Sequence, residues 1–489
     1  MDPLAQYLHN LSRRQFFGRA VGTVSSALGV GALASWLGSP RAADPAGRRG
    51  ALEALHFPPR CKRVIYLHMM GAPSQLDLFD HKPKLREYSG KDLRKLPEIY
   101  NDQRVTGMTS GQSSLPLVPS MFRFDRYANE QDGAFVSELY PHTGAIADKL
   151  CIVKTVHTEA INHEPGVTFM QTGSQVPGRP AFGAWLSYGL GQGNADLPAF
   201  IVMISMGFGN DQALSARLWN SGFLPSEHQG VRFRSAADPV LFLNDPQGVS
   251  RADRRRMLDA VAALNEREFE RSGDQEVLAR ITQGEMAFRM QASVPELTDI
   301  RGEDEQTLAM YGEDVHRPGS FARNCLLARR LAERDVRFIQ IYHRGWDAHG
   351  NLPREIREQC RMTDRAQAAL VRDLDRRGML DDTLVIWGGE FGRTAYCQGK
   401  FSETDYGRDH HGRCFTMWLA GGGIRRGIVH GETDEFGYNI VRDPVSVHDL
   451  HATLLRLLGI DHEKLTYRFQ GRHYRLTDIA GELVPGILA

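Results

Sequence analysis

The sequence has no excess of charge of either sign, and it lacks the motifs of several large enzyme classes. Its 489 residues carry 59 basic and 59 acidic side chains, and no basic block stands out. A nucleic-acid partner therefore has no electrostatic support, because binding to phosphate backbones depends on clustered Lys and Arg. No G-x-S-x-G elbow, Walker loop or dinucleotide fingerprint is present, which argues against the enzyme classes built on those motifs.

Cysteine pairs are also missing. The six cysteines contain no C-x-x-C pair, so the sequence does not predict a zinc ribbon. Disulfides are compatible with a location outside the cytoplasm, but their pairing cannot be read from spacing alone. The cysteines are Cys61, Cys151, Cys325, Cys360, Cys397 and Cys414.

The first forty residues differ from the rest of the chain. Arg13 and Arg14 precede an uncharged stretch, residues 20–37, that is rich in Ala, Gly, Val and Leu. This pattern is typical of a twin-arginine export signal, and the alternative, a membrane anchor, is disfavoured by the Gly and Ser content. We predict a signal peptide over residues 1–43, the Tat translocase as a partner during export, and a periplasmic or extracellular location. No later segment is apolar enough to span a bilayer, so no stable transmembrane segment is expected after cleavage.

Short apolar runs rich in β-branched residues predict six buried strands. Amphipathic helical patterns lie between many of them, for example at residues 321–334 and 356–374, and Ser446 with Asp449 forms a predicted capping box. Alternating strands and helices predict an α/β fold, a three-layer α/β/α sandwich with a mostly parallel central sheet. We expect one catalytic domain over residues 60–480, with a helical insertion at 205–319 that packs over or beside the site. The predicted strands cover residues 63–68, 151–156, 199–204, 336–342, 383–387 and 414–419.

Polar clusters follow several predicted strands, where ligands of such sheets usually bind. In the cluster at 343–351, Asp347 and His349 can point together at one cation. A carboxylate and an imidazole suit Zn²⁺, Mn²⁺ or Fe²⁺ better than Ca²⁺. The alternative is a turn capped by Asp347 with an exposed His349.

Two further clusters offer metal ligands and an anion-binding group. His410 and His411 precede the strand at 414–419, and because neighbouring side chains diverge in extended backbone, we expect one to ligate and the other to contact substrate. Glu390 could ligate a metal and Arg393 could hold an oxyanion with its planar fork. The alternatives are a surface loop for the histidines and a buried Glu390–Arg393 ion pair.

The remaining candidates lie earlier in the chain. Asp77 or Asp80 could complete a metal site, with Asp80 the better candidate for a structural cap. His163 could serve as ligand, general base or nucleophile, and the alternative is a loop histidine with structural bonds only. The candidate set is therefore Asp77, Asp347, His349, Glu390, His410 and His411 for metal, His163 and Arg393 for catalysis, and Ser74, Asn162 and His343 for substrate.

Four segments in their order along the chain resemble the alkaline phosphatase and sulfatase superfamily. The first strand with its following aspartate resembles the opening metal-binding strand, and His163-x-Pro165 to Thr172-Gly173 is similar to the sulfatase nucleophile motif. Glu390-Phe391-Gly392 stands where the superfamily has Asp-His-Gly, and residues 447–455 resemble a late packing helix, which implies structural roles for His448 and His451. The combined pattern resembles an exported branch of unknown function that is common in planctomycete-type bacteria.

The departures from the superfamily pattern limit what it implies. His163 occupies the position of the residue that sulfatases convert to formylglycine, and no Cys or Ser stands there. Ordinary formylglycine chemistry is therefore not expected. Glu390-Phe391 replaces Asp-His, so one ligand is lost or is supplied from elsewhere, for example by His410, and the two-metal site is either altered or reduced to one ion.

Together the motifs and the resemblance imply a metal-dependent hydrolase of phosphate or sulfate esters, or of related anionic esters. The expected cofactor is one or two divalent ions, Zn or Mn rather than Ca, and the expected substrate is an anionic small molecule or polysaccharide ester. The alternative is a member that has lost catalysis and binds sulfated or phosphorylated glycans.

Overall fold

The computed structural model of the chain describes residues 50–97, 99–100, 108–128, 133–210, 212, 214–234, 239–240, 245 and 247–489. The predicted signal peptide, residues 1–43, lies outside these ranges. All six predicted strands are confirmed. They are β1 (Arg63–Met69), β4 (Leu150–His157), β5 (Phe200–Ser205), β7 (Phe338–His343), β8 (Thr383–Gly388) and β11 (Phe415–Ala420).

These strands belong to one nine-stranded sheet. Its order is β12-β4-β11-β8-β1-β7-β5-β6, with β12 at Ile428–His430, β6 at Val231–Phe233 and β15 (Val445–Ser446) paired to β4. All pairings are parallel except those of β11, which runs antiparallel to both β4 and β8. Because β11 is reversed, the residues before it reach the same edge of the sheet as the residues that follow the parallel strands.

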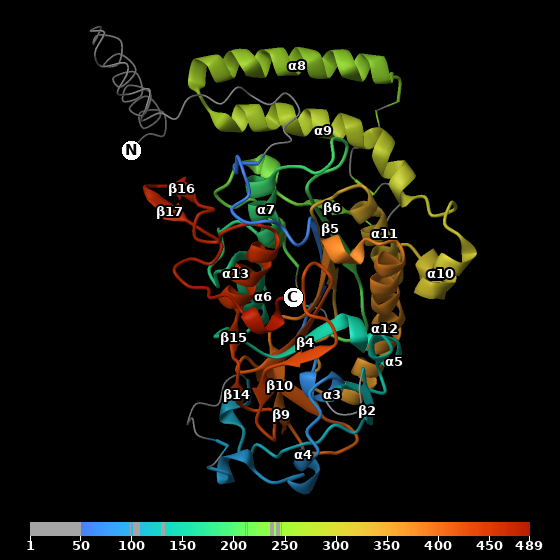
Figure 1. The fold of residues 1–489 in the computed structure, drawn as a ribbon, viewed down its shortest axis with the longest axis vertical. Helices are drawn as coiled ribbons and strands as arrows, with labels where there is room; N and C mark the ends of the chain where they lie inside the picture. Colours follow the sequence, from blue (N-terminus) through green and yellow to red (C-terminus); the bar gives the residue numbers. More distant parts are fainter. Residues whose placement is uncertain are drawn as a thin grey trace, which may run out of the picture. The chain divides into compact units, whose positions relative to one another are not determined.

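Helices cover both faces of this sheet, as the strand alternation predicts. On β1, Ile65 and Leu67 join one hydrophobic core cluster, whereas Val64 and Tyr66 join the other. Helices α11 (Phe321–Glu333) and α12 (Leu352–Arg376) pack into the first cluster; α6 (His163–Thr172), α7 (Phe182–Leu190) and α13 (Val447–Leu457) pack into the second. In Figure 1 the two groups of helices lie on opposite sides of the strands. The three-layer α/β/α architecture is confirmed.

The predicted helix cap of α13 and the predicted apolar face of α12 are both present in the structure. Ser446 and Asp449 form a complete capping box at the start of α13. On α12 the predicted apolar face, which includes Ile356, Leu370 and Leu374, is buried, and Gly378 follows the helix with φ 68°, a backbone conformation that glycine adopts at no steric cost.

Two long antiparallel helices dominate the segment predicted as an insertion. They are α8 (Arg251–Ser272) and α9 (Gln275–Thr298), followed by the short α10 (Glu305–Tyr311). Met290, Val294 and Leu297 of α9 are buried in the core, whereas α8 has no buried residue. The domain boundaries at 60–480 and 205–319 stay predictions.

A two-stranded antiparallel hairpin, β9 (Gly392–Gln398) and β10 (Gly407–His411), lies outside the main sheet. All six cysteines are buried without a disulfide. Among the described residues, no helix combines the length and apolar character needed to cross a membrane. Besides short 3-10 turns, the remaining short α-helices and strands of the described residues are α3 (Gln75–Leu78), α4 (Lys84–Glu87), α5 (Pro141–Gly144), β2 (Phe124–Tyr127), β3 (Ala134–Ser137), β13 (Glu432–Thr433), β14 (Ile440–Arg442), β16 (Tyr467–Phe469) and β17 (Arg472–Tyr474).

Candidate metal centre

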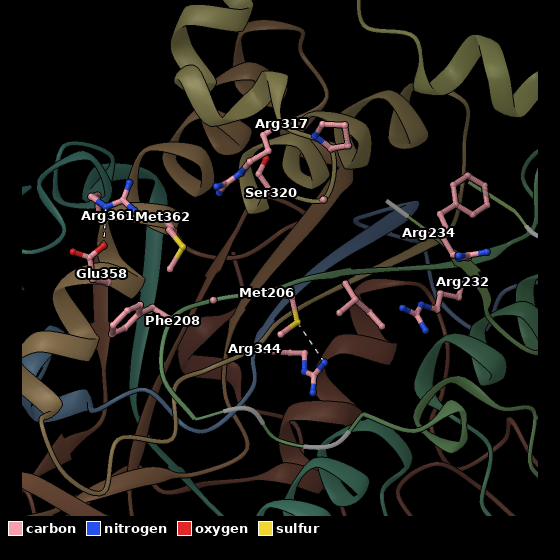
Figure 2. Close-up of a pocket in the computed structure, with 15 residues that line it drawn as sticks. Met206, Phe208, Arg232, Arg234, Arg317, Ser320, Arg344, Glu358, Arg361 and Met362 are labelled. Atoms are coloured by element: carbon pink, nitrogen blue, oxygen red, sulfur yellow. Dashed lines mark hydrogen bonds and ion pairs between the residues drawn. The ribbon is translucent and has the colours of Figure 1, made fainter. Parts of the chain in front are cut away.

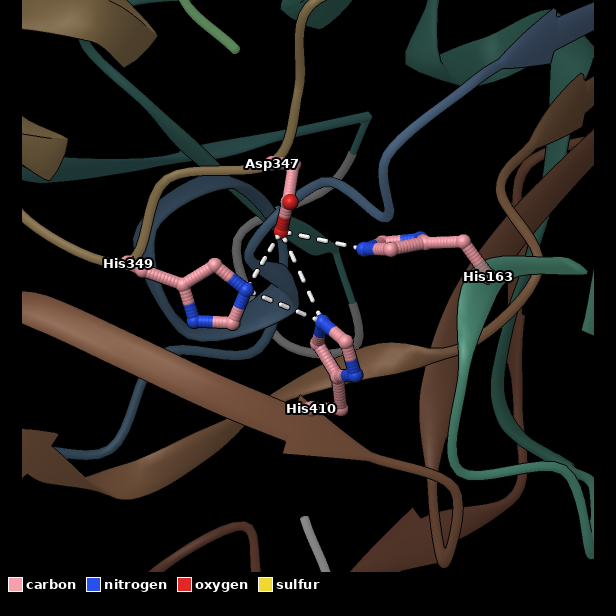
Figure 3. A group of neighbouring side chains, drawn as sticks. All are labelled: His163, Asp347, His349 and His410. Atoms are coloured by element: carbon pink, nitrogen blue, oxygen red, sulfur yellow. Dashed lines mark hydrogen bonds and ion pairs between the residues drawn. The ribbon is translucent and has the colours of Figure 1, made fainter. Parts of the chain in front are cut away.

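Three histidines surround one aspartate at the carboxyl edge of the sheet. The ligand atoms of His163, Asp347, His349 and His410 lie within 4.8 Å of one another, and Figure 3 shows all three rings directed at the same carboxylate. From Asp347 Oδ1, the distances to the Nε2 atoms of His349, His163 and His410 are 2.8, 3.0 and 3.5 Å. Imidazole and carboxylate donors in one small group are typical of transition-metal sites.

Separate parts of the fold bring these side chains together. His163 is the first residue of α6, Asp347 and His349 lie in the loop after β7, and His410 lies on β10. Gly407 allows the hairpin to approach that loop, because a Cβ atom there would lie 1.7 Å from the carbonyl oxygen of His349. A β-bulge between Arg408 and His410 adjusts the direction in which the following side chain points.

Each histidine ring is fixed by a hydrogen bond on its outer nitrogen. The Nδ1 atom lies 2.5 Å from Glu390 Oε1 in His163, 2.5 Å from Gln398 Oε1 in His349 and 2.7 Å from the carbonyl oxygen of Ile161 in His410. Since all three partners are acceptors, each Nδ1 carries a proton. Each Nε2 then donates to Asp347 when the ring is charged and offers a lone pair to a cation when the ring is neutral. Metal-ligating histidines are oriented in this way by outer partners.

The carboxylates of the site are held in their charged form. Burial raises the pKa of Asp347, but hydrogen bonds from His163, His349 and His410 and the charge of Arg393 outweigh burial and hold that pKa far below its usual range. The pKa of Glu390 is likewise depressed, since hydrogen bonds and charge from His163 and His68 outweigh its complete burial. A permanently ionised group at the centre favours a cation.

Burial acts in the opposite direction on the histidines. Burial lowers the pKa of His163, but its hydrogen bonds to Asp347 and Glu390 outweigh burial and raise that pKa overall. The pKa of His410 is lowered, mainly by burial and also by the charges of Arg393 and His163, despite its bond to Asp347. The neutral, metal-binding form of His410 is therefore favoured at neutral pH.

Arg393 supports the aspartate and the loop after β1. Its side chain is 1% exposed, and it donates to Asp347 Oδ1 at 2.6 Å, to the carbonyl oxygens of Ala72 and Arg408 at 2.9 and 3.1 Å, and to that of Gly71. Arg393 thus pairs with Asp347, whereas Glu390 pairs with His163. The alternative of a Glu390–Arg393 ion pair is not what the described residues form.

The structure places Asp77 and Ser74 in a different buried group. Asp77 accepts hydrogen bonds from Tyr406 (2.7 Å), Arg408 (2.8 Å) and Ser74 (2.5 Å). Burial raises the pKa of Asp77, but Arg408 and these bonds outweigh burial and lower it overall. The oxygens of Asp77 are therefore occupied by protein donors, and the convergence predicted for it with Asp347 and His410 is not seen.

His411 and His343 also point away from the cluster. His410 and His411 diverge, as expected for neighbours on a strand, and His411 Nε2 donates to the carbonyl oxygen of Tyr438 at 2.9 Å. Both ring nitrogens of His343 are engaged inside the fold, by Ser205 (2.9 Å) and Gln359 (3.1 Å). Burial lowers the pKa of each histidine to about 4, so both are neutral structural groups.

The other predicted positions lie at the rim or in the core. Asn162 is exposed at the N-terminus of α6, beside His163, and its side chain makes no capping bond. Asp80 bonds to Thr433 at 2.5 Å. His448 and His451 donate to the carbonyl oxygens of Gly173 and Met170 at 3.0 and 2.9 Å, in line with the packing role that the resemblance implies.

Two glutamines complete the site, and sequence reasoning did not single them out. Gln398 holds His349, and Gln212 Nε2 donates to Asp347 Oδ2 at 2.6 Å. Glutamine on a strand or in a loop carries no motif, so only the hydrogen bonds in the folded chain identify these residues.

The comparisons with known proteins place the chain in a family without naming its activity. No curated protein matches the sequence. Solved structures that resemble it include Ps i-CgsB (10% identity, covering 82% of this chain and 72% of that one, TM-score 0.35). They also include the PsFucS1 sulfatase from Pseudoalteromonas sp. (12% identity, covering 82% of this chain and 68% of that one, TM-score 0.34). A third is alkaline phosphatase from the Antarctic bacterium TAB5 (11% identity, covering 77% of this chain and 94% of that one, TM-score 0.29).

Two of these neighbours are by name a sulfatase and an alkaline phosphatase. At such low identities and TM-scores, the likeness transfers no chemistry to this chain. The sequence itself matches one family over residues 61–488, and the chain therefore belongs to DUF1501, described as a protein family of unknown function.

Proposed function

We propose that the chain is a metal-dependent hydrolase of phosphate or sulfate esters, or of related anionic esters, that acts outside the cytoplasm. The observation that supports this most directly is the group of three histidine Nε2 atoms within 3.5 Å of Asp347 Oδ1. In this proposal His163, Asp347, His349 and His410 hold a divalent transition metal, zinc or manganese rather than calcium. The described residues offer one such group, which favours a single ion.

The close approach of the His349 and His410 rings is more favourable with a bound cation than without one. The Nε2 atoms of His349 and His410 lie 3.1 Å apart, and their Nδ1 atoms already carry protons bound by other acceptors. Two lone pairs that face each other at this distance repel unless a proton or a cation lies between them. A cation relieves the repulsion and also satisfies the Asp347 carboxylate.

When bound, such a metal lowers the pKa of a coordinated water toward about 7 and neutralises an anionic ester. The chain's own groups prepare the site for this chemistry. Glu390 keeps the proton of His163 on Nδ1, and Arg393 and Gln212 fix the two oxygens of Asp347. His349 is the most exposed of the four side chains, at 18%, so the ester approaches from its side. Asn162, which is exposed beside His163, is the proposed donor to an ester oxygen.

The geometry favours a ligand role for His163 over a nucleophile or general base. Its Nδ1 is engaged by Glu390 and its Nε2 lies 3.0 Å from Asp347, so neither nitrogen faces solvent alone. Arg393 is similarly committed to carbonyl oxygens and to Asp347, which favours positioning of the aspartate over contact with substrate. We propose a solvent water as the nucleophile, since no Cys or Ser stands at position 163.

The four protein donors also favour a second candidate, a binding protein without catalysis. Zinc with four protein ligands is typical of closed structural sites, whereas catalytic zinc keeps an open position. Mn²⁺ and Fe²⁺ accept more ligands and would leave room for water beside the same four groups. A bound zinc ion with no open position would therefore support the binding protein, whereas bound manganese or iron would support the hydrolase.

The test combines metal analysis with a panel of phosphate and sulfate esters. The hydrolase proposal predicts that Asp347→Ala loses both tight metal retention and turnover, while Asp77→Asn, which alters a buried aspartate outside the cluster, keeps its metal. An Asp347→Ala protein that retains metal and activity contradicts the assignment. A metal-bound wild type that binds sulfated polysaccharide but hydrolyses no ester supports the second candidate.

A further inference from the structure

An arginine-rich cavity opens at the same edge of the sheet as the candidate metal centre. Its volume is about 610 Å³, and it is lined by residues that follow β5 and β7, by the end of β6, and by parts of α12 and the segment before α11. Figure 2 shows the polar side chains around it. Five arginines are among its described lining residues, namely Arg232, Arg234, Arg317, Arg344 and Arg361.

Two arginines of this arginine pocket, Arg232 and Arg234, have no ion-pair partner among the described residues. Both are exposed. Among the described lining residues the one carboxylate is Glu358, which pairs with Arg361 at 3.0 Å, and Arg317 pairs with Asp314 at 3.5 Å. The guanidinium groups of Arg232 and Arg234 therefore add positive potential to the cavity, which favours an anionic ligand.

The arginine side chains and the apolar surface of the pocket indicate the chemical class of its ligand. Guanidinium groups bind sulfate and phosphate oxygens with two parallel hydrogen bonds, which lysine cannot do, and no lysine is among the described lining residues. Met206 and Phe208, which are 56% and 38% exposed, add apolar surface on one wall. A cavity of this size falls within the range of about 300–1,000 Å³ for small-ligand sites, enough for a short stretch of a chain.

The pocket is joined to the metal centre through one loop. Arg344 donates from Nε and Nη2 to the carbonyl oxygen of Gln212 at 3.2 and 2.8 Å. The side chain of Gln212 bonds to Asp347 Oδ2 at 2.6 Å, and Asn210 donates to the carbonyl oxygen of Asp347 at 3.0 Å. A ligand in the pocket therefore lies against the residues that position the metal-binding aspartate.

We propose that the arginine pocket binds the anionic groups of a sulfated or phosphorylated polysaccharide, next to the ester that the metal centre acts on. Binding itself follows from the pocket alone, whereas its role as a substrate subsite rests on the proposed function. A nucleic acid is disfavoured, because the net charge is zero and the positive charge is gathered in a cavity instead of along a surface.

The test measures binding of dextran sulfate to the metal-loaded full chain, compared with phosphorylated dextran, uncharged dextran and double-stranded DNA. The double variant Arg232→Gln/Arg234→Gln should bind the anionic dextrans about tenfold or more weakly at low ionic strength, because each arginine supplies charged hydrogen bonds. The matched control, Arg256→Gln/Arg267→Gln, removes the same charge from exposed positions of α8 and should bind within about twofold of wild type.

The proposal is overturned if the double variant binds dextran sulfate as tightly as wild type does, or if wild type binds uncharged dextran equally well. It is also overturned if wild type binds DNA as tightly as dextran sulfate. The stronger of the two anionic dextrans identifies the group recognised. Arginine-dependent binding without hydrolysis of any ester leaves the pocket standing and removes the proposed function. If the double variant hydrolyses polysaccharide esters as fast as wild type, the proposed function stands and the pocket is not a substrate subsite.

Discussion

Replacing Glu390 by glutamine tests whether the negative charge beside His163 contributes to metal binding, because the size of the side chain stays the same. The Glu390 side chain is fully buried, and its Oε1 accepts from His163 Nδ1 at 2.5 Å and from the backbone of Gly71 at 3.0 Å. Glutamine keeps the size and one acceptor oxygen but removes the negative charge. Loss of such an outer partner weakens metal binding by about 10- to 100-fold, which corresponds to about 1.4–2.8 kcal/mol.

A competition titration against a coloured chelator measures this change in affinity, and the metal content after dialysis provides a second measurement. Asp80→Asn serves as the control, because Asp80 is also buried and paired, with Lys82 at 3.1 Å and Thr433 at 2.5 Å, but lies outside the cluster. We expect Asp80→Asn to lower the free energy of unfolding while its metal affinity stays at the wild-type value.

Metal binding by folded Glu390→Gln that is as tight as that of wild type would refute this role of Glu390. In that case the hydrogen bond between Glu390 and His163 does not orient a ligand, and His163 has to be assigned a different role.

Two further predictions concern the packing around the site and its response to acid. Gly407→Ala should lower the free energy of unfolding by about 2 kcal/mol or more and impair metal retention, since the new Cβ would lie 1.7 Å from the carbonyl oxygen of His349. Gly350→Ala, with no atom within 4 Å, should change little in the same urea titration. Acid should destabilise the metal-free protein, because burial depresses the pKa of three histidines to about 4, 4 and 3 in the folded state; these are His343, His411 and His451. Their neutral forms contribute stability that is complete above the unfolded value of about 6.5 and is lost as the pH falls toward 4, so a urea midpoint equal at pH 7.5 and pH 5 would contradict this.

The layers of the fold could be predicted because their signals are local. The apolar run of β1 and the periodic face of α12 each fix one element and its buried side, and the alternation of such elements leads to a covered, mostly parallel sheet. The reversed direction of β11 could not be predicted. It depends on pairing with β4 and β8, which join the strand to distant parts of the chain.

The site was predictable only in part, for a related reason. Asp347 and His349 follow a parallel strand, so the rule on carboxyl ends of strands selects them. The same rule selects Asp77, but the short helix α3 carries Asp77 to Arg408 and Tyr406, whose oxygen and nitrogen donors take up its carboxylate. No feature of the sequence indicates that pairing, or the arrangement of arginines from distant segments around one cavity.

The four proposed ligands come from the start of a helix, a loop after a strand and one arm of a hairpin, so no short peptide from this chain could hold the ion by itself. An ion that needs the finished sheet cannot direct the early steps of folding, in contrast to small zinc domains that fold around their metal. Apoprotein should therefore be folded and ready to take up metal as a last step. For a chain expected to cross the membrane already folded, the compartment in which folding finishes would then decide which metal is available to it.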